Sequence, residues 1–295
     1  TRRSSDLGFV FWGSLSDRIG RKPIILAGCL LAALTYFPVF KAITHTANPA
    51  LAAAQDNTRV VVSADPDTCS FQFNPTGTAK FTSSCDIAKA LLAKSSVNYT
   101  TVDAAPGTPA TVTVGDTVIP AYEGTLTGDE LKAAKAGFET AVNGALTQAG
   151  YPLVAADNTT IARADNFFDI FNAQNFTLVL LLTYLIILVT MVYGPIAAAL
   201  VELFPTRIRY SGMSLPYHIG NGWFGGLLPA TAFAISAQSG NIYAGLWYAI
   251  IVASMTVIVG LLLVPWNGHK RSLFADGTAT PASTDDMTGP GYRRA

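Results

Sequence analysis

The chain has 295 residues, of which 50% are apolar and only 13% are charged, whereas an average soluble domain carries about 25% charged residues. Its 19 Lys and Arg balance its 19 Asp and Glu, so net charge excludes nucleic acid or another polyanion as an expected partner. Three cysteines exclude a disulfide-dense secreted scaffold. Residues 170–201 and 210–269 contain no charge at all, which argues against a purely soluble protein.

Apolar segments of membrane-spanning length occur four times along the chain. A bilayer core of about 30 Å requires about 20 apolar helical residues. The sequence meets this requirement at 23–40, 176–204, 213–236 and 243–265, with a turn at 238–241. A shorter apolar piece at 7–11 is expected to end a preceding helix. Because the chain also begins without Met, we expect it to be a fragment of a longer protein.

Basic residues at the ends of these segments predict their orientation. Clusters occur at Arg18, Arg21 and Lys22, at Arg207 and Arg209, and at Lys270 and Arg271. If each segment crosses once, all three clusters lie on one side, which the positive-inside rule assigns to the cytoplasm. The tail 271–295 is then cytoplasmic, and we expect it to be disordered.

The opposite side receives residues 44–165, which carry 7 basic and 12 acidic residues. Short strands are predicted at 59–62, 70–73 and 110–114, and a helix at 86–94. Thr127 to Glu130 fits a capping box that would begin a second helix reaching to about 149, where Gly150 would end it. This segment is therefore predicted to be a small extracytoplasmic α+β module.

Cys69 and Cys85 both lie in this module. A disulfide between them would close a 17-residue loop and contribute roughly 3 kcal/mol in the chain-entropy estimate. An extracytoplasmic compartment allows it. The alternative is a pair of buried free thiols, and we favour the disulfide. Cys29, inside a predicted span, is interpreted as a packing residue.

The ten residues 13–22, GSLSDRIGRK, resemble the G-x-L-x-D-R-x-G-R-K signature of the major facilitator superfamily. Residues 201–212 and 214–226 look like the metabolite:proton symporter family within it, which includes transporters of proline and betaine, α-ketoglutarate, citrate and shikimate. The resemblance covers 7–43 and 170–270. The module resembles, more loosely, an insertion in one branch of that family.

This resemblance implies an all-α polytopic membrane protein, the last helices of a twelve-helix fold, with the small α+β extracytoplasmic insertion. Residues 1–43 would hold the end of helix eight, the cytoplasmic gate loop and helix nine, and 166–270 would hold helices ten to twelve. The bilayer would be a bacterial cytoplasmic (inner) membrane. The missing N-terminal half would be an obligatory partner, because the transport cavity lies between halves.

The resemblance also implies a cytoplasmic gate network, in which an acidic residue steadies the outward-facing state. Glu202 would pair with Arg21 or Arg18. The alternative is a solvated charged turn with Glu202 reaching water. The residues assigned to this network are Gly13, Asp17, Arg18, Gly20, Arg21, Lys22, Glu202 and Arg207.

Polar residues inside the spans are candidates for a substrate or proton cavity. His218 suits proton traffic, although a neutral histidine bonding a neighbouring helix is the favoured interpretation. Asn221 could bond a substrate carboxylate or another helix, and Trp223 could form a cavity wall. The second span offers Tyr184, Thr190 and Tyr193.

The sequence thus favours a secondary transporter that carries a small organic solute, such as a carboxylate or betaine, together with a proton. The alternative is a membrane-tethered sensor or solute-binding module that acts through its extracytoplasmic domain. We find no nucleophile–base pair, metal cluster or phosphate loop, so no enzyme activity, metal or cofactor is expected.

Overall fold

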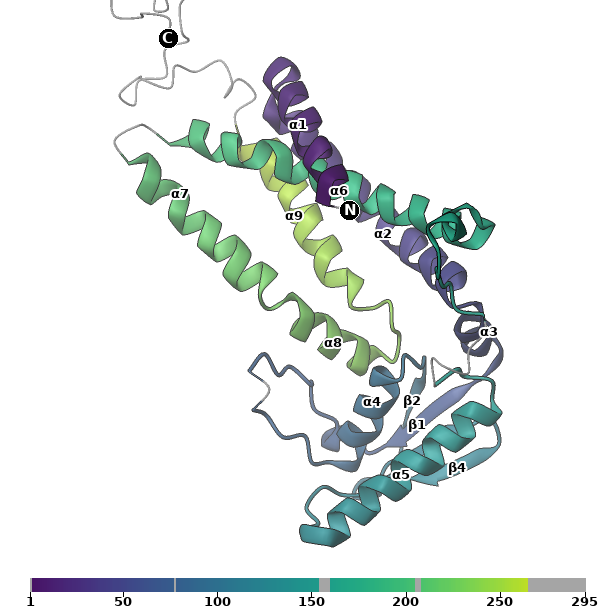
Figure 1. Cartoon of the computed structure of the whole chain (residues 1–295). Coiled ribbons are helices and arrows are strands. Elements are labelled where there is room, and N and C mark those ends of the chain that lie inside the picture. The colour runs from purple at the N-terminus through teal and green to yellow at the C-terminus, as the bar shows by residue number, and fades with distance from the viewer. Residues whose placement is uncertain (1, 77, 154–159, 205–207, 265–295) are drawn as a thin grey trace, which may run out of the picture. The chain divides into compact units, whose positions relative to one another are not determined.

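The computed structural model describes residues 2–76, 78–153, 160–204 and 208–264 (Figure 1). The chain forms two compact units. The first comprises Thr1–Thr35, Leu182–Gly226 and Ile250–Ala295, and the second comprises Tyr36–Leu181 and Leu227–Ala249. Helices α2 (Arg21–Ala47), α6 (Ala173–Leu203) and α9 (Leu246–Leu263) contribute residues to both units.

Three of the four expected spans are helices that are long and apolar enough to cross a membrane, namely α2, α6 and α9. The expected span 213–236 is instead divided into α7 (Arg209–His218), the π-helical segment η3 (Ile219–Gly225) and α8 (Leu228–Ser239). Pro216 lacks the N–H that a continuous helix needs, and irregular hydrogen bonding of the π type follows it. The stretch is therefore helical over most of its length but is not one regular α-helix.

The expected loop between the first two helices is a single residue. Helix α1 (Arg2–Ile19) and α2 are separated only by Gly20, whose N–H donates to the Ser16 carbonyl at 3.0 Å. Gly20 has a φ of +97°, a left-handed conformation that glycine adopts without a Cβ penalty. The motif residues therefore lie on two helix ends that meet at a tight turn.

The α+β module, residues 48–153 of the second unit, contains a four-stranded sheet in the order β2-β1-β3-β4. Strand β1 pairs in parallel with β2 and antiparallel with β3, which forms a hairpin with β4. One face of the sheet is buried: Val62, Val112 and Ile119 are buried, and they alternate along their strands with more exposed residues. The bounds are α3 (Pro49–Asn57), β1 (Val60–Ala64), η1 (Pro66–Thr68), α4 (Ser84–Lys94), β2 (Thr100–Asp103), β3 (Thr111–Val114), β4 (Thr117–Pro120) and α5 (Gly128–Gln148), with η2 (Phe167–Phe171) after the module.

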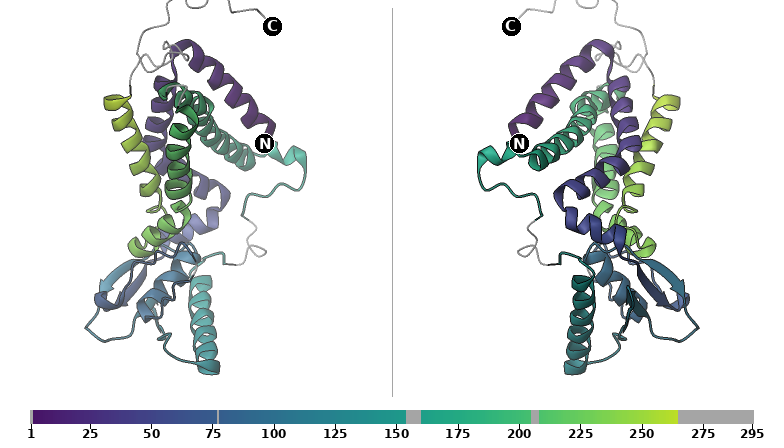
Figure 2. Two further views of the ribbon diagram at one scale, coloured as in Figure 1. Left: turned by 90° about the vertical axis from the view of Figure 1, so that its left-hand side faces the viewer. Right: turned by 90° about the vertical axis from the view of Figure 1, so that its right-hand side faces the viewer.

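Helices α4 and α5 supply the rest of the module's core. Leu92 from α4 and Val142 and Leu146 from α5 are fully buried against the strand residues. Figure 2 shows α5 as a long helix beside the sheet. The predicted strands at 59–62 and 110–114 and the two predicted helices are present with small shifts of their ends.

Two local expectations in the module were wrong. Residues 70–73 do not form a strand, because they bind α4 instead of a strand. The Ser70 N–H donates to Asp86 Oδ1 at 2.8 Å, and Gln72 Nε2 donates to the Asp86 carbonyl at 2.7 Å. The capping box is also absent: Thr127 precedes α5 without a side-chain hydrogen bond to it, and the following Gly128 has a φ of +61°.

Cys69 and Cys85 form a disulfide in the structure, with their Cα atoms 5.3 Å apart. It joins the end of η1 to the first turn of α4, where Cys85 is fully buried. We predict that mass spectrometry of the unreduced, digested protein will detect the two cysteine peptides as one linked species. Alkylation of both thiols before any reductant is added would contradict this pairing.

The turn between α8 and α9 is hydrogen-bonded to the module within the second unit (Figure 1). The Tyr99 N–H donates to the Gly240 carbonyl at 2.8 Å, and the Tyr99 hydroxyl donates to the Ala237 carbonyl. The Ile242 N–H donates to Asn98 Oδ1 at 3.0 Å. All three bonds use backbone groups of the end of α8 and the turn, namely the carbonyls of Ala237 and Gly240 and the N–H of Ile242, so the contact depends on the conformation of this segment.

Tyr151, which lies shortly after the end of α5 at Gln148, is expected to make the stability of the module depend on pH. Burial raises the pKa of its phenol to about 12 from an ordinary value of 10.0. Above pH 10 the unfolded state therefore releases a proton that the folded state keeps, and stability is lost as pH rises, by roughly 1 kcal/mol at pH 11. We predict that Tyr151→Phe reduces the fall in melting temperature between pH 8 and pH 11. Tyr210→Phe, at a residue that is 87% exposed, is the control and should leave that fall unchanged.

Candidate functional site

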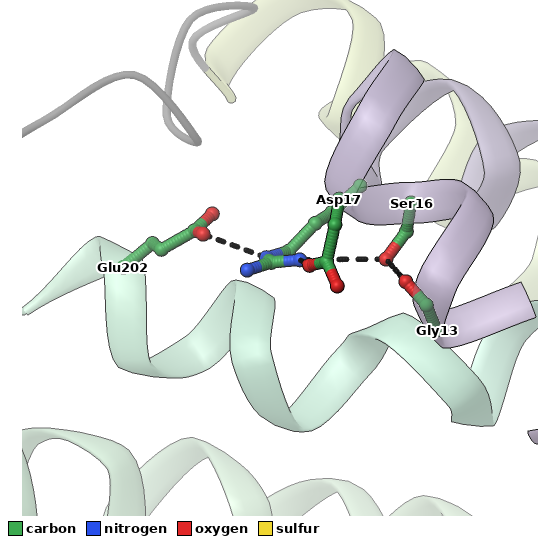
Figure 3. A network of polar contacts seen from close by, with 5 residues as sticks. Gly13, Ser16, Asp17 and Glu202 are labelled. Atoms are coloured by element: carbon green, nitrogen blue, oxygen red, sulfur yellow. Dashed lines mark hydrogen bonds and ion pairs between the residues drawn. The ribbon is translucent and has the colours of Figure 1, made fainter. Parts of the chain in front are cut away.

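An arginine at the start of α2 holds carboxylates from two other helix ends (Figure 3). Arg21 Nε donates to Glu202 Oε1 of α6 at 2.7 Å, and Arg21 Nη1 donates to Asp17 Oδ1 of α1 at 2.7 Å. Glu202 is 181 residues away in sequence, whereas Asp17 precedes Arg21 by four residues. The guanidinium therefore fastens the α1–α2 turn to the end of α6. We call Asp17, Arg21 and Glu202 the ion-pair network.

The two ion pairs of the network differ in burial. The side chains of Arg21 and Glu202 are 17% and 11% exposed, whereas that of Asp17 is 66% exposed. Exposed ion pairs contribute about 0–1 kcal/mol, but removing one partner of a buried pair is strongly destabilising because a desolvated charge remains. Of the two ion pairs, Arg21–Glu202 is therefore the one that contributes more to stability.

Ser16 belongs to the same site, although the sequence analysis did not select it. It is fully buried, its hydroxyl donates to the Gly13 carbonyl at 2.6 Å, and it accepts a longer 3.4 Å bond from Arg21 Nη1. Its backbone carbonyl also accepts the N–H of Gly20. Ser16 thus orders both the turn and the guanidinium. In the sequence it occupies a variable position of the motif, so only its spacing from Gly13 hinted at this role.

Lys22 ties the same turn to α9. Its Nζ donates to the Val264 carbonyl at 2.7 Å and to the Leu261 carbonyl at 3.4 Å, and the residue is only 8% exposed. These carbonyls belong to the end of α9, where helical acceptors lack internal donors and a cation is favourable. Adjacent motif residues therefore bind two different helices, α6 through Arg21 and α9 through Lys22.

The remaining assigned gate residues have weaker roles or fall outside the description. Arg18 is exposed, and the part of the chain that the structure describes offers it no side-chain partner. Gly13 lies inside α1 and contributes its carbonyl to Ser16, while Gly20 forms the turn. Arg207 lies outside the described residues.

The cavity candidates on α6 are not gathered at one place. Thr190 is 1% exposed and contacts α1, since a Cβ on Gly8 would lie 2.9 Å from its hydroxyl. Tyr184 shares a 2.9 Å hydrogen bond with Thr35 of α2. Tyr193 is 54% exposed. Two of these three residues therefore join helices within the first unit.

The candidates on α7 and η3 are exposed. A surface hollow of about 430 Å³ is lined by Tyr210, Ser211, Ser214, Leu215 and His218. His218 Nδ1 lies 2.7 Å from the carbonyl of Ser214, one turn earlier. Asn221 and Trp223 lie on η3, and Trp223 is 70% exposed. Of the six cavity candidates, only His218 lines this hollow.

The site can hold helices together and release them, because ion pairs and helix-end hydrogen bonds break without covalent change. Within the described ranges, no group of three or more His, Cys, Asp or Glu side chains could hold a metal ion.

Two proteins of Haemophilus influenzae resemble part of this chain, and each is named "Putative metabolite transport protein". One is 41% identical over 75 residues, which are 25% of this chain and 16% of that protein. The other is 36% identical over 80 residues, which are 26% of this chain and 18% of that protein. The chain thus covers less than a fifth of either relative. No family model and no solved structure matches it.

Proposed function

We propose that this chain forms part of a proton-coupled secondary transporter of the major facilitator type. The solute would be a small carboxylate or betaine, and the membrane would be a bacterial cytoplasmic membrane. The observation that carries the proposal is the ion-pair network, in which Arg21 joins two carboxylates from separate helices beside a one-residue turn. The similarity to two metabolite transport proteins and the three apolar helices support it.

In this proposal the network is a latch on the cytoplasmic side. While Arg21 holds Glu202 and Lys22 holds the last carbonyls of α9, the ends of α2, α6 and α9 move as one body. A carrier alternates between two conformations whose populations are set by small free-energy differences. Contacts made in only one conformation therefore set that balance, and protonation or solute binding would shift it.

Uptake of solute by the complete transporter tests this function. The protein is reconstituted in vesicles and supplied with labelled carboxylates and betaines, with and without an imposed pH gradient. We expect uptake that the gradient drives and an uncoupler abolishes. Uptake that is indifferent to the uncoupler would refute proton coupling, and no uptake of any solute would refute the carrier proposal.

The proposal also predicts a topology in which Ile19 faces the cytoplasm and Thr101 faces outside. Both residues are exposed, so single cysteines there are accessible, and the buried Cys29 is replaced by Ala to leave no other free thiol. An impermeant maleimide applied to intact spheroplasts should label Thr101→Cys and not Ile19→Cys. After permeabilisation both should react. Labelling of Ile19→Cys in sealed cells would reverse the orientation.

A further inference from the structure

The short 3₁₀ helix η2 lies between the module and α6 in the chain and has the sequence FFDIF. Phe168 and Phe171 are 77% and 71% exposed, whereas Ile170 between them is half-buried. A 3₁₀ helix has three residues per turn, so side chains at positions i and i+3 lie on the same side of it. The side chains of Phe168 and Phe171 therefore form one exposed aromatic surface, which we call the η2 face.

The one acidic residue of η2 does not interrupt this face. Asp169 Oδ2 accepts hydrogen bonds from the N–H groups of Asp165 and Asn166, both at 2.8 Å. Because two backbone donors bind this carboxylate, part of its charge is satisfied without water, and the side chain is held toward the preceding segment. The η2 face itself therefore consists of apolar atoms.

Side-chain amides at the start of α6 fix the orientation of η2. Asn175 is 7% exposed, and its Nδ2 donates to the carbonyl of Asp169 at 2.9 Å. Gln174 Nε2 donates to the carbonyl of Thr160 at 3.0 Å and to that of Thr46, in α2, at 2.8 Å. All these residues belong to the second unit. The direction of the η2 face is therefore tied to the ends of two apolar helices.

Exposed apolar surface continues from η2 along α6. Only Asn172 separates η2 from α6. Phe176 and Leu180, one turn apart on α6, are 47% and 54% exposed. At 1.5 Å per residue, the 31 residues of α6 extend about 46 Å, which exceeds the hydrocarbon core of a bilayer, about 30 Å thick. When α6 crosses a membrane, its first turn and the adjoining η2 are therefore expected at the level of the lipid head groups.

We propose that the η2 face inserts into the bilayer at the boundary between head groups and acyl chains, and that it anchors the junction between the module and α6 to the lipid. Exposed apolar patches mark interaction sites for proteins or membranes. The continuity of this patch with the exposed apolar surface of a membrane-spanning helix favours lipid as its partner. The proposal requires that α6 cross a membrane, and it does not depend on the solute or on proton coupling.

Spin labels on single cysteines measure the depth of the η2 face. Phe168→Cys is compared with Ile187→Cys near the middle of α6 and with Val118→Cys on strand β4, which are 42% and 61% exposed in the wild type. Each variant also carries Cys29→Ala, which removes the free thiol. The chain is reconstituted in vesicles of phosphatidylcholine and phosphatidylglycerol. Collisions with oxygen, which concentrates in lipid, and with a water-soluble nickel chelate are then measured by power saturation.

We expect the label at Phe168→Cys to lie about 5–10 Å below the membrane surface, shallower than the label at Ile187→Cys. The label at Val118→Cys should collide freely with the chelate. If the label at Phe168→Cys met the chelate as often as that control, the η2 face would lie in water. If it were shielded from both oxygen and the chelate, protein would cover the face. Either result would overturn the proposal.

A second pair of variants tests whether the aromatic face itself holds η2 in the membrane. A label at Phe171→Cys reports the depth while Phe168 is replaced by Ser or by Leu. Phe168→Ser should raise collisions with the chelate by about five-fold or more, because it removes most of the apolar area. Phe168→Leu keeps an apolar side chain and should change them little. An unchanged depth in Phe168→Ser would show that α6 alone positions η2, and the anchor would be refuted. Unchanged circular dichroism confirms that both variants fold.

Discussion

Glu202→Gln is expected to lower the free energy of unfolding of the chain in detergent by roughly 2–3 kcal/mol. The amide keeps the shape of the side chain but removes the charge opposite Arg21, which is 17% exposed and would retain only the exposed Asp17 as an ionic partner. In the complete transporter the same change should shift the balance between conformations by about ten-fold or more. Denaturant unfolding followed by circular dichroism measures the first effect.

Two further acid-to-amide substitutions are the comparisons for Glu202→Gln. Asp17→Asn removes the exposed partner of Arg21 and should cost about 1 kcal/mol or less. Asp129→Asn breaks the pair with Lys132, whose side chains are 81% and 98% exposed, and should have almost no effect. A double-mutant cycle with Arg21→Met isolates the coupling. Equal costs for all three acidic residues would show that burial does not set the strength of the network.

Gly240→Ala is expected to detach the α8–α9 turn from the module. Gly240 has a φ of +71°, and an added Cβ would collide with the carbonyl oxygen of Tyr99, which is a backbone atom and cannot rotate away. The left-handed conformation alone costs an L-residue about 1–2 kcal/mol. Hydrogen exchange should therefore accelerate at the amides of Tyr99 and Ile242, whose acceptors lie across this contact.

Gly107→Ala separates the cost of the left-handed backbone conformation from the effect of the Cβ collision. Gly107 has a similar φ of +77°, but nothing lies within 4 Å of its added Cβ. It should show the cost of the backbone conformation without the collision. If exchange at Tyr99 and Ile242 were as slow in Gly240→Ala as in the wild type, the hydrogen bonds between the turn and the module would not exist in solution.

The sequence predicted the three long apolar helices, but it did not predict the irregular hydrogen bonding of the stretch between α6 and α9. Helices α2, α6 and α9 were predicted because long charge-free runs have few alternatives to a bilayer. The stretch 213–236 looks equally apolar, yet it is divided into three pieces. Hydropathy measures the transfer of side chains from water to an apolar phase. It does not register the missing N–H of Pro216, which interrupts the backbone hydrogen bonds of the helix.

The sequence predicted some contacts of the candidate site and some elements of the module, and it missed others. Asp17 and Arg21 lie on two different helices and meet because the chain turns at Gly20 between them, and the pairing with Glu202 came only from the family resemblance. Strands β2 and β4 were missed because they are short and mostly exposed, so they lack the apolar alternation of β1 and β3. The burial of Tyr151 depends on packing and has no signal in sequence.

The hydrogen bond at Asn98 has a practical consequence for producing this protein. Asn98, Tyr99 and Thr100 form an acceptor sequence for N-linked glycans. In the folded chain the Asn98 amide oxygen already accepts the N–H of Ile242, close to the Tyr99 contact with Gly240. A sugar attached to that side chain in a yeast or insect-cell secretory pathway, before folding is complete, would place a bulky group where the turn must dock. Expression in a host without this modification, or with Thr100→Ala to remove the acceptor sequence while keeping Asn98, avoids trapping the chain in an undocked form.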